Sequence, residues 1–313
     1  MKKISDYLIA GGLVLLLLII VYACLPREQA PTNANAVKKI KVVASFYPMH
    51  DFASNIGKEK VELTTLIPYG SEPHEYEPTP SDIIKLSEAD FFIYNGGGLE
   101  GWADKLVEGA DNKKLIVVET TKGIDLLPAG EGVEATDEGK DPHTWLDPVI
   151  AKQQAFAIKE AFQEADPANK QYYEDNYLAY SKKLDKLDSD LRLAFSSCKK
   201  KDILITHATL GYFCKEYGCN QMAITGVNPE AEPSPAELIK IIEQAKEKNV
   251  KAVFFESLIN PKSAELISKE INGYVLAFHS VHGLTDDEKA RGEDYYSLME
   301  GNIANIKKAL ECN

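Results

Sequence analysis

Apolar and polar residues alternate along the chain with two different periods, which predicts strands and helices in turn. Apolar runs of about four to eight residues indicate buried strands, whereas apolar residues spaced three and four apart indicate helices. Strands are expected at 39–46, 61–67, 91–94, 115–118, 203–206, 222–225, 252–256 and 274–278. Strands joined through helices at this spacing form parallel sheets covered on both faces.

The helices between these strands carry recognisable start and stop residues. Thr79 is the expected N-cap of one helix, with Pro80 in its first turn, and Gly57 closes the helix before it. The other helices are expected at 49–56, from 148 to about 164, at 210–217, 236–248 and 263–271, and from about 294 to 310. The pattern as a whole predicts an α/β protein.

One predicted helix is much longer than the rest. It runs from Pro167 to about Ser197, with Asp166 as its cap. Its apolar residues form one stripe along nearly the whole length: Tyr173, Tyr177, Tyr180, Leu184, Leu187, Leu191 and Phe195. At about 1.5 Å per residue it is on the order of 45 Å long, more than a small lobe needs. We therefore expect two α/β lobes, each a parallel sheet with flanking helices, joined by this helix as a strut.

The beginning of the chain has the pattern of an export signal. Lys2 and Lys3 precede an apolar run at 7–23, which is shorter than the about 20 residues of a membrane span. The run ends in VYAC, which resembles the bacterial lipobox and implies cleavage before Cys24 and a diacylglycerol on its sulfur. An uncleaved anchor is the alternative. In both cases the folded part lies outside the cytoplasmic membrane, held by a polar tether at 25–37.

Length and composition fit this organisation. The 313 residues are enough for two domains, and 44% hydrophobic with 27% charged residues is typical of a soluble globular protein. The net charge of −13 argues against a nucleic-acid partner. The expected divisions are a lipoprotein signal peptide at 1–24, the tether at 25–37, an N-terminal lobe at 38–165, the connecting helix at 166–198 and a C-terminal lobe at 199–313.

Four cysteines follow Cys24, and an exported chain can pair them. They are Cys198, Cys214, Cys219 and Cys312, and they allow three connectivities between which the sequence does not decide. A thiolate metal site is the rival interpretation. It is disfavoured because the cysteines lack C-x-x-C spacing and because the histidines offer a better site.

Four histidines occupy equivalent places in the two predicted lobes. His74 and His143 lie in proline-bounded loops of the first lobe, and His207 and His279 each follow a strand of the second. Ligands bind at the carboxyl ends of strands in open parallel sheets, so these histidines can face one cleft. Four neutral imidazoles suit a closed, tetrahedral zinc site. His282 is kept as a substitute for His279, because the segment FHSVH at 278–282 offers either.

Other classes of function fit the sequence less well. A zinc hydrolase needs an open coordination position and a general base, but His74-Glu75 lacks the second histidine of H-E-x-x-H. Four histidine ligands leave no position for a reactive water, so we expect no enzyme. A surface adhesin that uses only the lipid anchor would not explain four histidines at these positions.

Three histidine segments resemble the metal motifs of one family. GSEPHEYEPTP at 70–80, DPHTWLDP at 141–148 and ITHATLGYF at 205–213 are similar to motifs of the substrate-binding lipoproteins of zinc and manganese ABC importers. GVNPEAEPS at 226–234 is similar as well, and the resemblance covers nearly all of 40–311. It implies two lobes, a rigid connecting helix and a metal between them. The ligands it carries over are His74, His143 and His207.

The sequence departs from this family at two places. Members commonly supply an aspartate as the fourth ligand where this chain has His279, which makes His279 the preferred fourth ligand. Zinc members often have a histidine-rich loop before the second motif, whereas 129–141 is acidic and contains no histidine. This loop is expected to be a mobile, solvated insertion, with a weak role in gathering metal as the alternative.

The third ligand bears on the choice of metal. Manganese members of the family typically have a glutamate where this chain has His207, and nitrogen-rich sites favour zinc, copper or nickel. We therefore predict zinc, with manganese, copper and nickel as alternatives. Glu256 ends a strand and is expected to orient a ligand imidazole, unless it is an ordinary acid at a strand end. The predicted protein is a monomer that is lipid-anchored to the membrane and hands zinc to an ABC permease.

Overall fold

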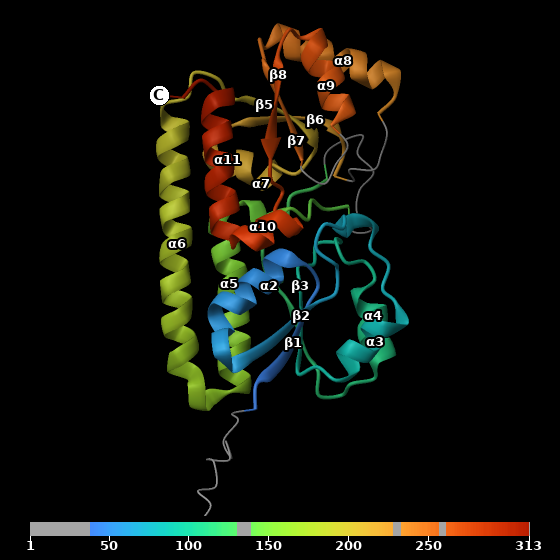
Figure 1. Ribbon diagram of the computed structural model, residues 1–313, viewed down its shortest axis with the longest axis vertical. Coiled ribbons are helices and arrows are strands. Elements are labelled where there is room, and N and C mark those ends of the chain that lie inside the picture. Colours follow the sequence, from blue (N-terminus) through green and yellow to red (C-terminus); the bar gives the residue numbers. More distant parts are fainter. Residues whose placement is uncertain (1–37, 130–138, 228–232, 257–260, 313) are drawn as a thin grey trace, which may run out of the picture. The chain divides into compact units, whose positions relative to one another are not determined.

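Two parallel sheets organise the part of the chain that the computed structural model describes, residues 38–129, 139–227, 233–256 and 261–312 (Figure 1). The first sheet has the order β2-β1-β3-β4 and the second β6-β5-β7-β8, and the strand pairings within both are parallel. The strands are β1 (Ile40–Ala44), β2 (Val61–Thr65), β3 (Phe91–Tyr94), β4 (Ile116–Glu119), β5 (Asp202–His207), β6 (Asn220–Thr225), β7 (Ala252–Glu256) and β8 (Tyr274–Phe278). The predicted α/β class with two lobes is confirmed.

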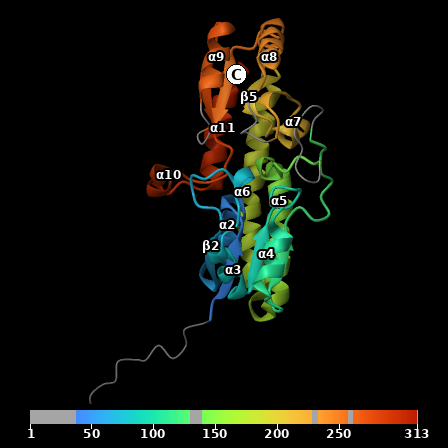
Figure 2. The same cartoon turned by 90° about the vertical axis from the view of Figure 1, so that its right-hand side faces the viewer.

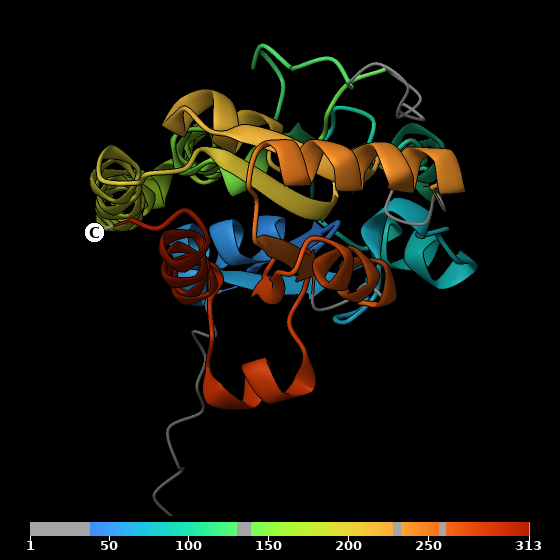
Figure 3. The ribbon, with the colours of Figure 1, turned by 90° about the horizontal axis from the view of Figure 1, so that it is seen from above.

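Helices flank both sheets. Those of the first lobe are α2 (Tyr47–Gly57), α3 (Pro80–Ser87), α4 (Ala103–Ala110) and α5 (Pro148–Ala165). Those of the second are α7 (Gly211–Tyr217), α8 (Pro235–Glu247), α9 (Lys262–Glu270), α10 (Asp286–Arg291) and α11 (Tyr295–Ala309). Thr79 caps α3 as expected, and its N–H donates to Asp82 over 2.8 Å. Figures 2 and 3 show α10 projecting away from the other helices of its lobe.

The long helix α6 (Lys170–Ser196) contacts α5 and α2 of the first lobe and α11 and α7 of the second. Its predicted apolar stripe from Tyr173 to Phe195 is buried throughout. The strut interpretation is thus confirmed. Asp166 holds the predicted N-cap position, at the start of the 3-10 turn (Pro167–Asn169) that leads into the helix, but its carboxylate accepts from the Asn169 side chain and the Tyr173 hydroxyl instead of from a backbone N–H.

One hydrophobic cluster runs from the first lobe through α6 into the second. It includes Val42 of β1, Phe162 of α5, Leu184 of α6, Ile205 of β5 and Phe278 of β8. Because the lobes share this core, separating them would expose apolar surface. A shared core of this kind opposes large movements between the lobes.

Two disulfides pair the four cysteines. Cys198–Cys312 joins the end of α6 to the end of the described chain, and Cys214–Cys219 joins α7 to the residue before β6. These bonds decide the connectivity that the sequence left open. The rival thiolate metal site is wrong, because all four sulfurs are used.

Among the described residues, no helix combines the length and apolarity that a bilayer span needs. The predicted signal peptide, Cys24 and the tether lie outside the described residues. So does most of the acidic loop, but its base is described. There the Ala129 N–H donates to the Gly139 carbonyl and the Asp141 N–H to the Leu127 carbonyl.

Candidate metal centre

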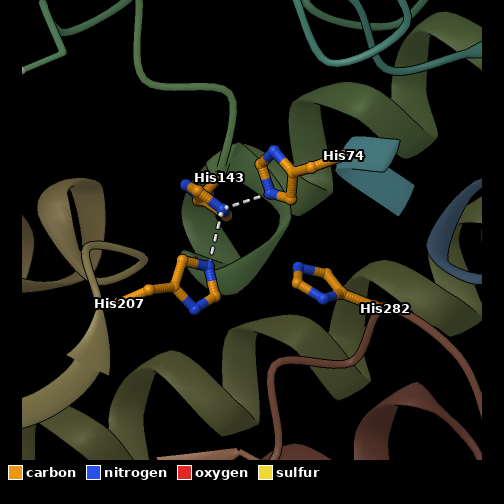
Figure 4. A group of neighbouring side chains, drawn as sticks. All are labelled: His74, His143, His207 and His282. Atoms are coloured by element: carbon orange, nitrogen blue, oxygen red, sulfur yellow. Dashed lines mark hydrogen bonds between the residues drawn. The ribbon is translucent and has the colours of Figure 1, made fainter. Parts of the chain in front are cut away.

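Four imidazoles from distant parts of the sequence meet at the carboxyl ends of the two sheets (Figure 4). His74 lies in a 3-10 turn (Pro73–Glu75), and His143 directly precedes another (Thr144–Leu146). His207 is the last residue of β5, and His282 lies in the loop after β8. One ligand atom from each lies within 4.8 Å of the other three.

The distances between ring nitrogens fit a tetrahedral ion. The Nε2 atoms of His74 and His143 are 3.1 Å apart, and those of His143 and His207 are 3.3 Å apart. Tetrahedral zinc with Zn–N bonds of about 2.0–2.1 Å separates its ligand nitrogens by about 3.3 Å. The spacing of these two pairs is therefore that of nitrogens bound to one zinc ion.

The protonation of these rings points the same way. The Nδ1 atoms of His143 and His207 face carboxylates, and in the tautomer that donates to these carboxylates the two Nε2 atoms present lone pairs to each other. Two lone pairs at 3.3 Å repel unless a cation lies between them. The Nε2 of His282 is buried and finds no hydrogen-bond partner among the described residues. A cation bound between the rings would attract the facing lone pairs and would give the Nε2 of His282 a partner.

His282, and not His279, is the fourth member of the group. The expectation for His279 is therefore corrected, and its substitute takes the place. The Nε2 of His279 lies 3.3 Å from Glu288, and its Nδ1 accepts the Val281 N–H over 2.9 Å, so both nitrogens are used elsewhere. Between these two histidines the backbone turns at Val281, where φ is 58°. Only after this turn does an imidazole, that of His282, face the cleft.

Three of the four imidazoles have a carboxylate at Nδ1. Asp141 lies 2.8 Å from His143, and Glu256 lies 2.5 Å from His207. Glu72 lies 3.6 Å from the Nδ1 of His282, and the Ser280 hydroxyl lies 3.2 Å from the same nitrogen. Such carboxylates fix the tautomer and the orientation of a ligand imidazole.

Of these three acids, Glu256 is expected from the sequence, whereas Asp141 and Glu72 are not. Each of the latter two stands two residues before a histidine and accepts that histidine's backbone N–H. The signal they share is an acid-x-His spacing in both loops. From the sequence alone no role is predicted for the acids beside His74, because four histidines already complete a tetrahedral set of ligands.

Burial and the carboxylates move the pKa values of these histidines in different directions. Burial lowers the pKa of His74 well below its ordinary value, and it lowers that of His143 although Asp141 opposes the shift. Burial also acts to lower the pKa of His282, but Glu72 outweighs it and the pKa is raised. His74 and His143 are thus neutral near neutral pH, and of these three rings His282 most readily holds a proton.

Trp145 supports the site from beneath. Its buried indole lies 5.3 Å from the rings of both His143 and His282, and its Nε1 donates to the Ser280 carbonyl over 2.8 Å. A residue of the first lobe thereby holds the backbone that leads to His282. The Asn95 side chain holds the loop of His143, since it donates to the carbonyl of the preceding residue, Pro142, over 2.9 Å.

Comparison with known proteins places this fold and site in a family. Residues 42–309 match the family described as ZnuA, zinc-uptake complex component A, periplasmic. The chain belongs to the ZnuA family. This confirms the resemblance drawn from the motifs. The family consists of solute-binding components of uptake complexes rather than enzymes, and its periplasmic place agrees with the expected location outside the cytoplasm.

Named ZnuA-like proteins resemble the chain in sequence. The high-affinity zinc uptake system protein ZnuA of Bacillus subtilis is 36% identical over 283 residues, which are 87% of this chain and 88% of that protein. The zinc-binding lipoprotein AdcA of Streptococcus pneumoniae is 33% identical over 319 residues. That match spans 99% of this chain but only 62% of AdcA.

Solved structures of ZnuA-like proteins share the fold. The Zn(II)-bound ZnuA-like domain of S. pneumoniae AdcA has a TM-score of 0.77 at 33% identity, covering 88% of this chain and all (100%) of that domain. The laminin-binding protein Lmb of Streptococcus agalactiae, described as bifunctional with adhesin and metal transporting activity, has a TM-score of 0.79. Its identity is 29%, over 87% of this chain and 100% of Lmb.

Proposed function

We propose that this protein captures one zinc ion between its lobes and delivers it to the permease of an ABC importer. The ligands are His74, His143, His207 and His282. The observation that carries the proposal is the meeting of four imidazoles whose ligand atoms lie within 4.8 Å of one another. The zinc-related names of the B. subtilis and S. pneumoniae relatives support it.

The donor set favours zinc over manganese. Manganese prefers oxygen ligands, whereas this centre offers imidazole nitrogens from four residues. The carboxylates of Asp141 and Glu256 lie at the Nδ1 atoms of His143 and His207 and leave the Nε2 atoms of these two rings to the metal. Four protein ligands also close a tetrahedral coordination sphere, whereas a catalytic zinc keeps one position open for water.

Capture and handover follow from the architecture. A signal peptide at 1–24, a lipid on Cys24 and a tether at 25–37 would hold the protein beside its permease. The first lobe (38–165) and the second lobe (199–313) each contribute two ligands, and the connecting helix (166–198) keeps their separation nearly constant. The protein acts as a monomer, since one chain supplies all four ligands.

The adhesin alternative has a structural precedent in Lmb, which combines adhesion with metal transport. The buried histidine group accounts for transport and gives no reason for adhesion, because groups inside the protein cannot contact a host matrix. We therefore keep zinc delivery as the function of this chain.

Zinc titration calorimetry on residues 25–313 tests the proposal. One tight zinc equivalent is expected, with weaker binding of manganese. His74→Ala and His282→Ala should each weaken zinc binding by more than about 100-fold, since they remove ligands rather than their partners. His50→Ala is the matched control, because His50 bonds to Thr65 away from the centre. The absence of stoichiometric zinc binding would refute the proposal.

The lipid anchor has a separate test. In cells, Cys24→Ser should move the protein from the membrane fraction to the soluble extracytoplasmic fraction without changing zinc affinity. Cys198→Ser is the control for the loss of a cysteine, because it leaves Cys24 intact and should leave the protein on the membrane. Retention of the Cys24→Ser variant on the membrane would contradict lipid attachment.

A further inference from the structure

The short segment between His279 and His282 has a strained backbone. Val281 has φ of 58°, in the left-handed region, and its side chain is buried. Six non-glycine residues of the described chain have a positive φ, and Val281 is the β-branched residue among them. The other five are Lys58, Asp111, Asn249, Asn272 and Glu311. A β-branched residue adopts this conformation only where its surroundings enforce it. Some contact must therefore hold the turn.

His279 provides that contact. Its Nδ1 accepts the N–H of Val281 over 2.9 Å, a bond that spans the turn. Because Nδ1 accepts, the proton of the neutral ring lies on Nε2, which lies 3.3 Å from the Glu288 carboxylate and donates to it. Both nitrogens are thus engaged in holding structure.

His279 is itself fixed on both sides. The Asn302 side chain of α11 accepts the His279 N–H over 2.7 Å and donates to its carbonyl over 2.8 Å. Glu288 of α10 also accepts the N–H and the hydroxyl of Thr285 over 2.8 and 2.9 Å. His279 is therefore bonded to α11 through its backbone, and its ring connects α10 to the turn.

The turn decides where His282 points. On one side of it, the Ser280 carbonyl accepts from Trp145. On the other, Gly283 packs against the first lobe so closely that a Cβ there would lie 3.3 Å from the Gly70 nitrogen. With both flanks held, the conformation of Val281 sets the direction of the His282 ring.

We propose that His279 is a positioning residue that holds the left-handed turn at Val281 and thereby aims His282 at the metal. The inference rests on the proposed zinc function and adds to it. The segment FHSVH carries two histidines because one binds the metal and the other braces the turn.

The test compares His279→Ala with His279→Asn in the full chain, purified in detergent. Alanine removes the brace and should weaken zinc binding by about 10- to 100-fold, the range for residues that orient ligands. Asparagine keeps an acceptor that can bond to an N–H two residues on, so most of the affinity should return. His282→Ala should lose more affinity than either variant.

A second pair of variants tests the turn itself. Glycine adopts positive φ without strain, so Val281→Gly should make the brace dispensable. In the Val281→Gly variant, adding His279→Ala should then change zinc affinity by less than about threefold. In the protein that keeps Val281, the same substitution should reduce zinc affinity by about 10- to 100-fold. An equal loss in both backgrounds would overturn the proposal, as would wild-type affinity in His279→Ala.

Trp145 gives a readout that needs no zinc. In a Trp102→Phe background Trp145 is the sole tryptophan, and its indole bonds to the turn at Ser280. His279→Ala should shift its emission in the metal-free protein, and His279→Asn should not. If the wild type binds no zinc, the proposed function fails, whereas unchanged emission in a folded His279→Ala variant refutes the brace. If His279→Ala does not fold, the tryptophan emission of metal-free His279→Asn and Val281→Gly is measured instead. A shift in the emission of His279→Asn then refutes the proposal that His279 holds the turn.

Discussion

Each ligand imidazole has two nitrogens with separate tasks. At His143 and His207 the Nε2 atom faces the centre while the Nδ1 atom faces a buried carboxylate. The carboxylates of Asp141 and Glu256 hold these rings in the tautomer that can bind a cation. Metal affinity in this protein therefore depends on acids that do not touch the metal.

Removing such an acid should weaken zinc binding while leaving the ligands in place. Asp141→Asn and Glu72→Gln are each expected to reduce zinc affinity by about 10- to 100-fold. Glu75→Gln is the matched control, since Glu75 is exposed and adjacent to His74. Calorimetric titration measures the difference. Equal affinities for Glu72→Gln and Glu75→Gln would show that Glu72 does not orient His282.

The pH dependence of binding follows from the same pairs. Zinc needs neutral rings, and the raised pKa of His282 means that this ring gains a proton at a higher pH than an ordinary histidine does. Zinc affinity should therefore decrease as the pH falls from about 7.5 through the ordinary histidine value of about 6.5. Glu72→Gln, which removes the cause of the raised pKa, should reduce the number of protons released on binding near neutral pH. Titrations in buffers of different ionisation enthalpy measure that number, and an unchanged release would contradict the assignment.

Elements with strong periodic patterns were predictable from the sequence. The bounds of β3, β7 and β8 match the predicted strands, and the stripe of α6 is visible as recurring Tyr and Leu residues. Three of the four clustered histidines can likewise be assigned from the sequence, because strand ends and proline-bounded loops indicate where such side chains gather.

Short elements and single turns were not predictable. The helix α10 spans six residues and has no buried residue, so no apolar period marks it. The choice between His279 and His282 depends on one φ angle at Val281, and valine gives no sign of a left-handed turn. Only the tertiary contacts of His279 explain it.

The two disulfides differ in the length of chain they close. Cys198–Cys312 has a sequence separation of 114, and Cys214–Cys219 has a separation of 5. A longer closed loop restricts the unfolded chain more. Replacing the first pair by serine should lower the free energy of unfolding by about 4–5 kcal/mol, and replacing the second by about 2 kcal/mol. Denaturant unfolding tests this, and a larger loss from the short loop would contradict it.

At the scale of the whole molecule, Asp51 ties both lobes to the connecting helix. Its buried carboxylate accepts from the hydroxyls of Tyr47 in α2 and Tyr180 in α6, and from the backbone N–H of Tyr295 in α11. Burial raises the pKa of Asp51 to about 6, although the hydrogen bonds from Tyr180, Tyr295 and Tyr47 oppose the shift. No cation of the described residues is bonded to it, so the carboxylate depends on neutral donors.

The stability of the two-lobed unit should therefore vary with pH through this residue. Because the folded pKa of Asp51 lies above its ordinary value of 3.8, the folded protein binds more protons between about pH 4 and 6. The contribution of Asp51 to the free energy of unfolding should fall by about 3 kcal/mol as the pH rises through this interval. Asp51→Asn should remove this slope in denaturant unfolding, and the exposed Asp175→Asn should not. An identical slope in wild type and Asp51→Asn would contradict the assignment.

The central claim is that four imidazoles from two lobes bind one zinc ion. Crystals of residues 25–313 loaded with zinc, measured above and below the zinc absorption edge, test it most directly. We expect one anomalous peak per chain at about 2.0–2.1 Å from a ring nitrogen of each of His74, His143, His207 and His282. A peak coordinated by His279, by carboxylate oxygens in place of the imidazoles, or at no histidine would contradict it.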